Sequence, residues 1–152
     1  MQLSPNFSLN QLVYSETAEQ NGIDNTPPPE VVPNLKRLAA GLEAVRALLG
    51  APLEISSGYR SAALNEAVGG SSASQHVQGL AADFVCPGFG TPLEVARAIQ
   101  GSGMQFDQCI LEYGRWVHLS FSDAPRGRTL TIYDEEEGYI AGLWDEEGKR
   151  IA

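Results

Sequence analysis

An aspartate inside an apolar run is the feature that most constrains the fold of this chain. Asp83 lies within Leu80–Cys86, an otherwise apolar run (LAADFVC) whose length and composition predict a buried strand. Burying an ionised carboxylate without a partner is strongly unfavourable, so a cation or a strong hydrogen-bond donor must face it. A metal ion would meet this requirement, and so would an arginine such as Arg60.

The composition indicates one globular domain. The chain has 152 residues, which is enough for one compact domain, and its 43% hydrophobic content supports a core. Charged residues make up only 19%, which excludes a coiled coil or a charge-rich disordered segment. The formal net charge of -9 has the wrong sign for holding phosphate backbones. We therefore expect no nucleic-acid partner.

The distribution of apolar residues argues against membrane insertion. No apolar run approaches the ~20 residues that a membrane span needs. Residues 1–10 lack the basic start and apolar stretch of a secretory signal. We therefore expect no signal peptide and synthesis in the cytoplasm.

The order of predicted elements defines an α+β class, with helices packed on a mostly antiparallel sheet. Helical periodicity covers 7–20, with Ser8 as N-cap, and 30–49, which ends at Gly50. The other expected elements are strands at 53–57, 80–86, 108–113 and 116–121, a brief helix within 58–70, a helix at 91–101 capped by Thr91, and a terminal hairpin at 128–145. A tight connection at Gly114-Arg115 joins the strands at 108–113 and 116–121. The single domain, 1–152, thus divides into N-terminal helices (7–50), a metal-site core (53–122) and a C-terminal hairpin (128–145).

The chain has just two histidines, and both lie at element edges beside polar groups. His76 precedes Asp83 by seven residues, and a loop of that length entering a strand can bend both side chains toward one point. Gly79, between them, is expected where the backbone needs an unusual dihedral. His118, on a neighbouring strand, could supply a third ligand. The alternative is that each histidine is an ordinary hydrogen-bonded residue.

These three residue types suit a catalytic zinc ion. Imidazole nitrogens and carboxylate oxygens are good zinc ligands, and three protein ligands leave the fourth position for water. A closed structural site would be expected to recruit cysteines. Cys86 and Cys109 instead lie in apolar runs, where we expect buried free thiols, with a disulfide or a metal role as the alternative.

Three motifs carry a resemblance to a known family. Ser74–Asp83 (SQHVQGLAAD) matches the S-x-H-x-x-G-x-A-x-D pattern of the zinc D-alanyl-D-alanine carboxypeptidases and related peptidoglycan endopeptidases. Ser57–Ser61 (SGYRS) and the WVHLSF strand resemble two further segments of that family in the same order. The likeness covers residues ~7 to 122, and the opening is similar to that of a phage-associated branch. The resemblance implies the hedgehog/DD-peptidase fold.

The resemblance also implies roles for individual residues. His76, Asp83 and His118 would bind Zn2+. Arg60 would lie beside the scissile carbonyl and stabilise its developing oxyanion, although a buried ion pair with Asp83 is the alternative. The implied substrate-binding residues are Ser57, Tyr59, Ser74 and Trp116, of which Tyr59 could equally cover the core.

The general base departs from the family pattern. Many members carry Glu three residues before the second histidine, and this chain has Arg115 there, which cannot accept a proton at neutral pH. Glu112 is our candidate replacement, six residues before His118, as in the related hedgehog signalling domain. Its alternative is a solvated charge at a strand end. Asp107 could orient His118, since ligating imidazoles usually donate their other N–H to a carboxylate or carbonyl.

These observations predict a zinc peptidase that acts on peptidoglycan stem peptides at a D-Ala-containing bond, either as a carboxypeptidase or as an endolysin-type endopeptidase. We expect a monomer that works at the bacterial cell wall in phage or prophage lysis. Arg115 motivates an alternative, a catalytically inactive metal-binding wall or phage structural module of the same fold. A zinc amidase that cuts between sugar and peptide is a further alternative.

Overall fold

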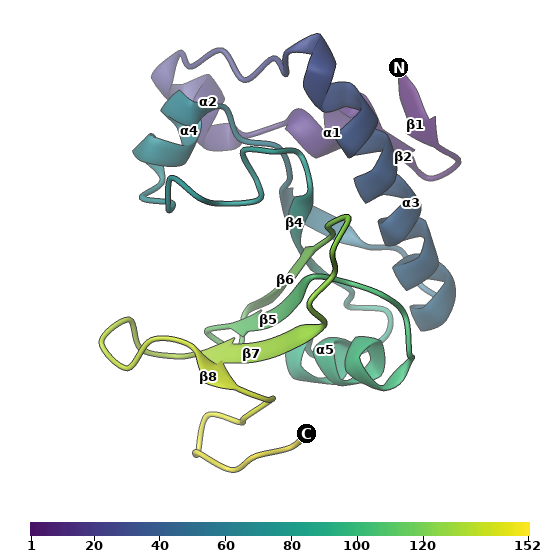
Figure 1. The fold of residues 1–152 in the computed structure, drawn as a ribbon, viewed down its shortest axis with the longest axis vertical. Coiled ribbons are helices and arrows are strands. Elements are labelled where there is room, and N and C mark those ends of the chain that lie inside the picture. Colours follow the sequence, from purple (N-terminus) through teal and green to yellow (C-terminus); the bar gives the residue numbers. More distant parts are fainter.

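A six-stranded sheet organises the molecule. The computed structural model describes residues 1–152, and Figure 1 shows the arrangement of its helices and strands. The strand order is β3-β4-β6-β5-β7-β8. The strands are β3 (Glu54–Ser57), β4 (Ala81–Val85), β5 (Gln108–Glu112), β6 (Trp116–Ser120), β7 (Arg128–Ile132) and β8 (Ile140–Ala141). Neighbouring strands run antiparallel except β5 and β7, which are parallel. The predicted α+β class and mostly antiparallel sheet are confirmed.

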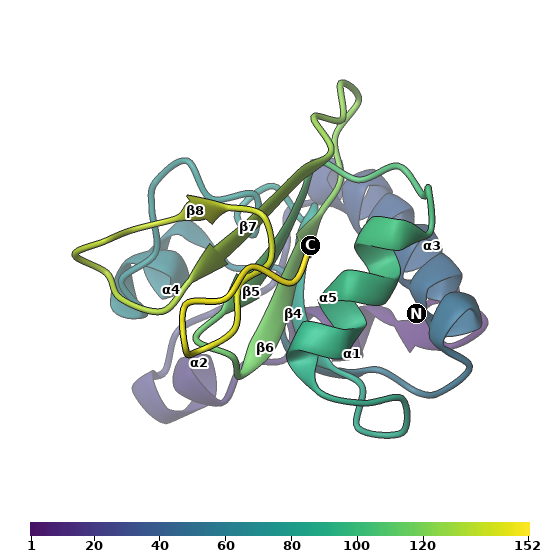
Figure 2. The same cartoon turned by 90° about the horizontal axis from the view of Figure 1, so that it is seen from below.

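Helices cover one face of this sheet. Figure 2 shows α3 (Val32–Leu49) and α5 (Pro92–Gly101) on the same side of the strands. Side chains alternate between the faces of a strand, so Ala82 and Phe84 of β4 pack into the helix-covered core together with Leu119 of β6. Asp83 and His118 therefore point to the opposite face, which the two helices leave open.

The helix boundaries follow local capping chemistry. Thr91 and Glu94 form a capping box at the start of α5, with Pro92 in the first turn. Gly50 ends α3 in the left-handed conformation, with φ 69°. The brief helix expected within 58–70 is α4 (Ala62–Ala67), which Ser61 caps. These boundaries agree with the sequence expectations.

The N-terminal region differs from the single helix expected over 7–20. It forms α1 (Leu9–Val13) and α2 (Glu16–Asn21), because Tyr14 adopts an extended conformation and Ser15 caps the second helix. Ser8 caps α1 as predicted. A small unpredicted hairpin of β1 (Gln2–Ser4) and β2 (Phe7–Ser8) precedes it, and a 3-10 turn, η1 (Pro29–Val31), leads into α3.

The turn between β5 and β6 begins one residue earlier than expected, at Tyr113. Tyr113 and Gly114 both have positive φ, 58° and 66°, and the Arg115 N–H donates to the Glu112 carbonyl at 3.0 Å. Positive φ at both central residues is typical of a type I′ turn, which matches the twist of antiparallel strands. A tyrosine in this conformation costs about 1 kcal/mol relative to glycine. The connection is thus 113–115, which contains the expected Gly114-Arg115 pair and adds Tyr113, and Arg115 itself is exposed.

Both cysteines are buried free thiols, as predicted. Burial raises the pKa of the Cys109 thiol to about 12, which keeps it protonated and unreactive at neutral pH. The C-terminal hairpin expected at 128–145 is confirmed as the antiparallel pair of β7 and β8. No helix has both the length and the apolar character required for a membrane span.

Candidate metal centre and active site

Asp83 and His118 lie opposite each other on neighbouring strands, on the open face of the sheet. They are register partners in the antiparallel pairing of β4 with β6. The His118 Nδ1 lies 2.9 Å from Asp83 Oδ1. Both residues are buried, so this polar pair is shielded from bulk water although it lies outside the apolar core.

His76 reaches the same carboxylate from the loop that leads into β4. Its Nδ1 lies 2.7 Å from the Gly58 carbonyl oxygen, which can only accept, so Nδ1 donates this hydrogen bond. The Nε2 atom therefore faces Asp83 Oδ1, at 3.2 Å. Gly79 bends the loop back with φ 74°, as expected for that position.

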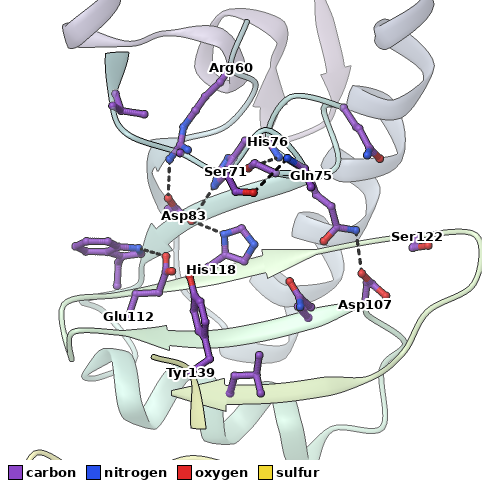
Figure 3. Close-up of a pocket in the computed structure, with 18 of the residues that line it drawn as sticks. Arg60, Ser71, Gln75, His76, Asp83, Asp107, Glu112, His118, Ser122 and Tyr139 are labelled. Atoms are coloured by element: carbon purple, nitrogen blue, oxygen red, sulfur yellow. Dashed lines mark hydrogen bonds and ion pairs between the residues drawn. The ribbon is translucent and has the colours of Figure 1, made fainter. Parts of the chain in front are cut away.

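The three predicted metal ligands converge (Figure 3). One donor atom each from His76, Asp83 and His118 lies within 4.8 Å of the others, and this group could hold a metal ion. The imidazole rings are edge to face, with centroids 5.0 Å apart. Two imidazole nitrogens and one carboxylate oxygen form a donor set that fits zinc with an open position. The spatial prediction made from the sequence is confirmed.

The charges of this cluster favour cation binding. Burial opposes ionisation of Asp83, but hydrogen bonds from His118 and His76 outweigh it and hold the pKa of the carboxyl well below its usual range. Burial likewise opposes the charged form of His118, yet the hydrogen bond to Asp83 raises its pKa. The carboxylate thus stays ionised and draws positive charge to itself, and a metal ion would replace protons in this role.

Arg60 forms the ion pair that the sequence left as an alternative. Its guanidinium NH2 atom lies 3.5 Å from Asp83 Oδ2, on the other carboxylate oxygen from the histidines. The Nε donates to Ser57 Oγ at 3.1 Å, and NH1 donates to Asn65 Oδ1 at 3.3 Å. Arg60 also lines the cleft described below, so it can contact a ligand there. Asn65 is buried, and its contact with Arg60 could not be predicted from the sequence, because an asparagine in a short helix gives no signal of its own.

Two predicted substrate-binding residues lie elsewhere. Tyr59 is buried in the apolar core, because its N–H donates to the Leu12 carbonyl and holds the residue under α1. The Ser57 hydroxyl accepts a hydrogen bond from Arg60, and Ser57 does not line the cleft. Ser74 and Trp116 do line it.

Glu112 lies in the cleft wall beside the donor cluster. Its Oε1 accepts a hydrogen bond of 2.8 Å from the Trp116 indole, its register partner on β6. Burial raises the pKa of Glu112 above its ordinary value, with the charge of His118 acting in the opposite direction. A raised pKa makes a carboxylate a better proton acceptor. Arg115, at the position where many relatives carry Glu, is exposed and outside the cleft.

The expected hydrogen bond from the His118 imidazole to the Asp107 carboxylate is not formed. Asp107 is buried, and its carboxylate accepts from the Arg126 guanidinium at 2.9 and 2.7 Å and from Gln75 Nε2 at 2.9 Å. Arg126 had no sequence signal because it approaches from a separate loop. Gln75 is adjacent to His76, so Asp107 instead ties the histidine loop to the sheet.

We expect Asp107→Asn to destabilise the protein by about 1–3 kcal/mol at pH 7, because it removes charge-assisted hydrogen bonds. The hydrogen bonds from Arg126 outweigh burial and lower the pKa of Asp107 to about 2. The unfolded value is about 3.9, so this stabilisation is complete above pH ~4 and is lost as the pH falls toward 2. Urea unfolding of both proteins across this range should show the gap closing, and a constant gap would contradict the assignment.

A single cleft collects these groups. It has a volume of about 870 Å³, and its walls are mostly polar. The donor cluster, Glu112 and Arg60 all line it, together with residues of the 69–78 loop and of the β7–β8 hairpin. Such a volume is typical of a ligand site.

An α+β fold with a buried two-histidine, one-aspartate donor set in a polar cleft is typical of metal-dependent hydrolases. A family model described as Peptidase M15 matches residues 5–120. The chain therefore belongs to this family of zinc-dependent peptidases. No curated protein matches the chain.

Proposed function

We propose that this metallopeptidase hydrolyses a D-Ala-containing bond in peptidoglycan stem peptides, with His76, Asp83 and His118 as the zinc ligands and Glu112 as the general base. The observation that carries the proposal is the convergence of the three donors in the cleft that Glu112 lines. The motif S-x-H-x-x-G-x-A-x-D around His76 supports the cell-wall substrate. The resemblance of the opening to a phage-associated branch supports a role in phage or prophage lysis.

The side chains divide the chemistry between them. Zinc, when bound, supplies Lewis acidity toward the scissile carbonyl and the attacking water. Glu112 accepts a proton from the water as the water oxygen bonds to the carbonyl carbon. The guanidinium of Arg60 lies close enough to the cluster to stabilise negative charge on the carbonyl oxygen. Glu112 then returns the proton to the nitrogen as the C–N bond breaks, which releases a free amine.

The test is digestion of purified peptidoglycan by the zinc-loaded protein. We expect new amino groups to appear in proportion to time, with mass spectrometry placing the cut within the stem peptide and a chelator stopping the reaction. A cut between sugar and peptide would show an amidase instead. Binding to sacculi without any release of amino groups would show an inactive wall-binding module.

A further inference from the structure

One end of the cleft carries aromatic rings and an acidic side chain that the proposed mechanism does not use. Tyr113, Trp116 and Tyr139 line this end, and Glu135 lies with them. Figure 3 shows Tyr139 directed from the β8 side toward Glu112 and His118. Trp116 and Tyr113 contact each other, with ring centroids 5.6 Å apart and ring planes at 57°.

The protein itself positions two of the rings, those of Trp116 and Tyr113. Trp116 is oriented by its hydrogen bond to Glu112. Tyr113 occupies a left-handed turn position, φ 58°, where glycine or asparagine would be unstrained. A strained backbone that presents a bulky side chain to a cleft is typical of functional positions.

The charge balance of the cleft leaves this end negative. Both lining arginines are already paired, Arg60 with Asp83 and Arg126 with Asp107. Glu135 forms no salt bridge, and it is the only residue of the acidic run 134–137 that lines the cleft. Partial burial and then the charge of Glu135 raise the pKa of the Tyr113 phenol, which places the carboxylate near the rings.

We propose that the cleft end formed by Tyr113, Trp116, Glu135 and Tyr139 binds a primary ammonium group of the substrate peptide. This inference rests on the proposed function, because it names a recognition element of the same peptide. An ammonium ion over aromatic faces gains a cation–π attraction, and a carboxylate beside the rings supplies the counter-charge. A neutral sugar could stack on the same rings but would leave the charge of Glu135 without a counter-charge. The ammonium could come from the N-terminus of the stem peptide or from the side chain of a diamino acid within it.

The test compares binding of three synthetic stem peptides: one with both amines free, one acetylated on the side-chain amine, and one acetylated on the N-terminus. Calorimetry uses zinc-loaded Glu112→Gln protein, so that turnover does not interfere. We expect acetylation of one of the two amines to weaken binding about five- to thirtyfold. The acetylated peptide that binds more weakly identifies which amine supplies the ammonium group. This preference should shrink at high salt, because partly exposed charges are screened.

The matched variants locate the effect. Adding Glu135→Gln or Tyr139→Ala should remove most of the preference for the free amine, whereas Glu136→Gln, in the same turn but outside the cleft, should leave it intact. Equal binding of all three peptides would overturn the inference. So would a Tyr139→Ala loss that is the same for free and acetylated peptides, because the rings would then bind another part of the substrate. Failure of the wild-type protein to cleave any peptide, with the amine preference intact, would contradict only the proposed function.

Discussion

Replacing Glu112 by glutamine should lower the rate of peptide hydrolysis by at least about a hundredfold while bound zinc stays near one equivalent. In the wild type, the Trp116 indole donates to Glu112 Oε1 at 2.8 Å. Glutamine has the same shape, and its amide oxygen can still accept this hydrogen bond. It cannot accept a proton from water, however. The variant therefore separates proton transfer from metal binding. Amino-group release and metal analysis of the purified protein are the two measurements.

The matched control for this variant is Glu147→Gln, which removes an exposed carboxylate outside the cleft and should keep full activity. Wild-type activity in Glu112→Gln would assign the general base to another residue. Loss of zinc from the variant would instead make Glu112 part of the metal site.

Asp83→Asn should reduce bound zinc to below about a tenth of an equivalent and abolish hydrolysis. Asparagine keeps the shape of the side chain but removes the negative charge that faces both imidazoles, and a neutral amide oxygen is a much poorer zinc ligand than a carboxylate. Zinc at a hundred times its dissociation constant should stabilise the wild-type protein by about 2.7 kcal/mol. Thermal unfolding with and without zinc should show this gain in the wild type and almost none in Asp83→Asn.

Asp107→Asn provides the control, because Asp107 is also a buried aspartate in the cleft wall but lies outside the donor set. It should keep zinc and the zinc-dependent stabilisation, although its starting stability is lower. Retention of one equivalent of zinc in Asp83→Asn would contradict the proposed ligand set. Loss of zinc in both variants would point to collapse of the cleft rather than loss of a ligand.

Several features of the fold were predictable because short-range chemistry controls them. Capping side chains and left-handed glycines determine where helices begin and end, so Ser8, Thr91 and Gly50 marked the observed boundaries. The expected helix over 7–20 failed at Tyr14, whose extended conformation divides it into two. Ser15, which caps the second helix through the Ala18 N–H, was a local signal for this break that the apolar periodicity of 7–20 outweighed in the prediction.

Features that depend on contacts between distant segments were not predictable in the same way. Three such contacts join distant segments: the parallel pairing of β5 with β7, the burial of Tyr59 under α1, and the ion pair of Arg126 with Asp107. The local sequence of one segment does not predict which other segment it contacts. The left-handed turn at Tyr113 also opposes local preference, because a tyrosine there is strained.

By itself the sequence determined most of the helices and strands, the buried carboxylate and the motif that assigned the chain to its class of peptidase. An ionised Asp83 in an apolar strand needs a cationic or hydrogen-bond-donating partner wherever the strand lies in the fold. This requirement can therefore be inferred from the sequence. The tertiary structure alone decided which groups meet that demand: His76 through the Gly58 carbonyl, His118 through strand register and Arg60 on the second oxygen. Partners in a buried site are chosen by distance and direction in space, and these are set only when the whole chain has packed.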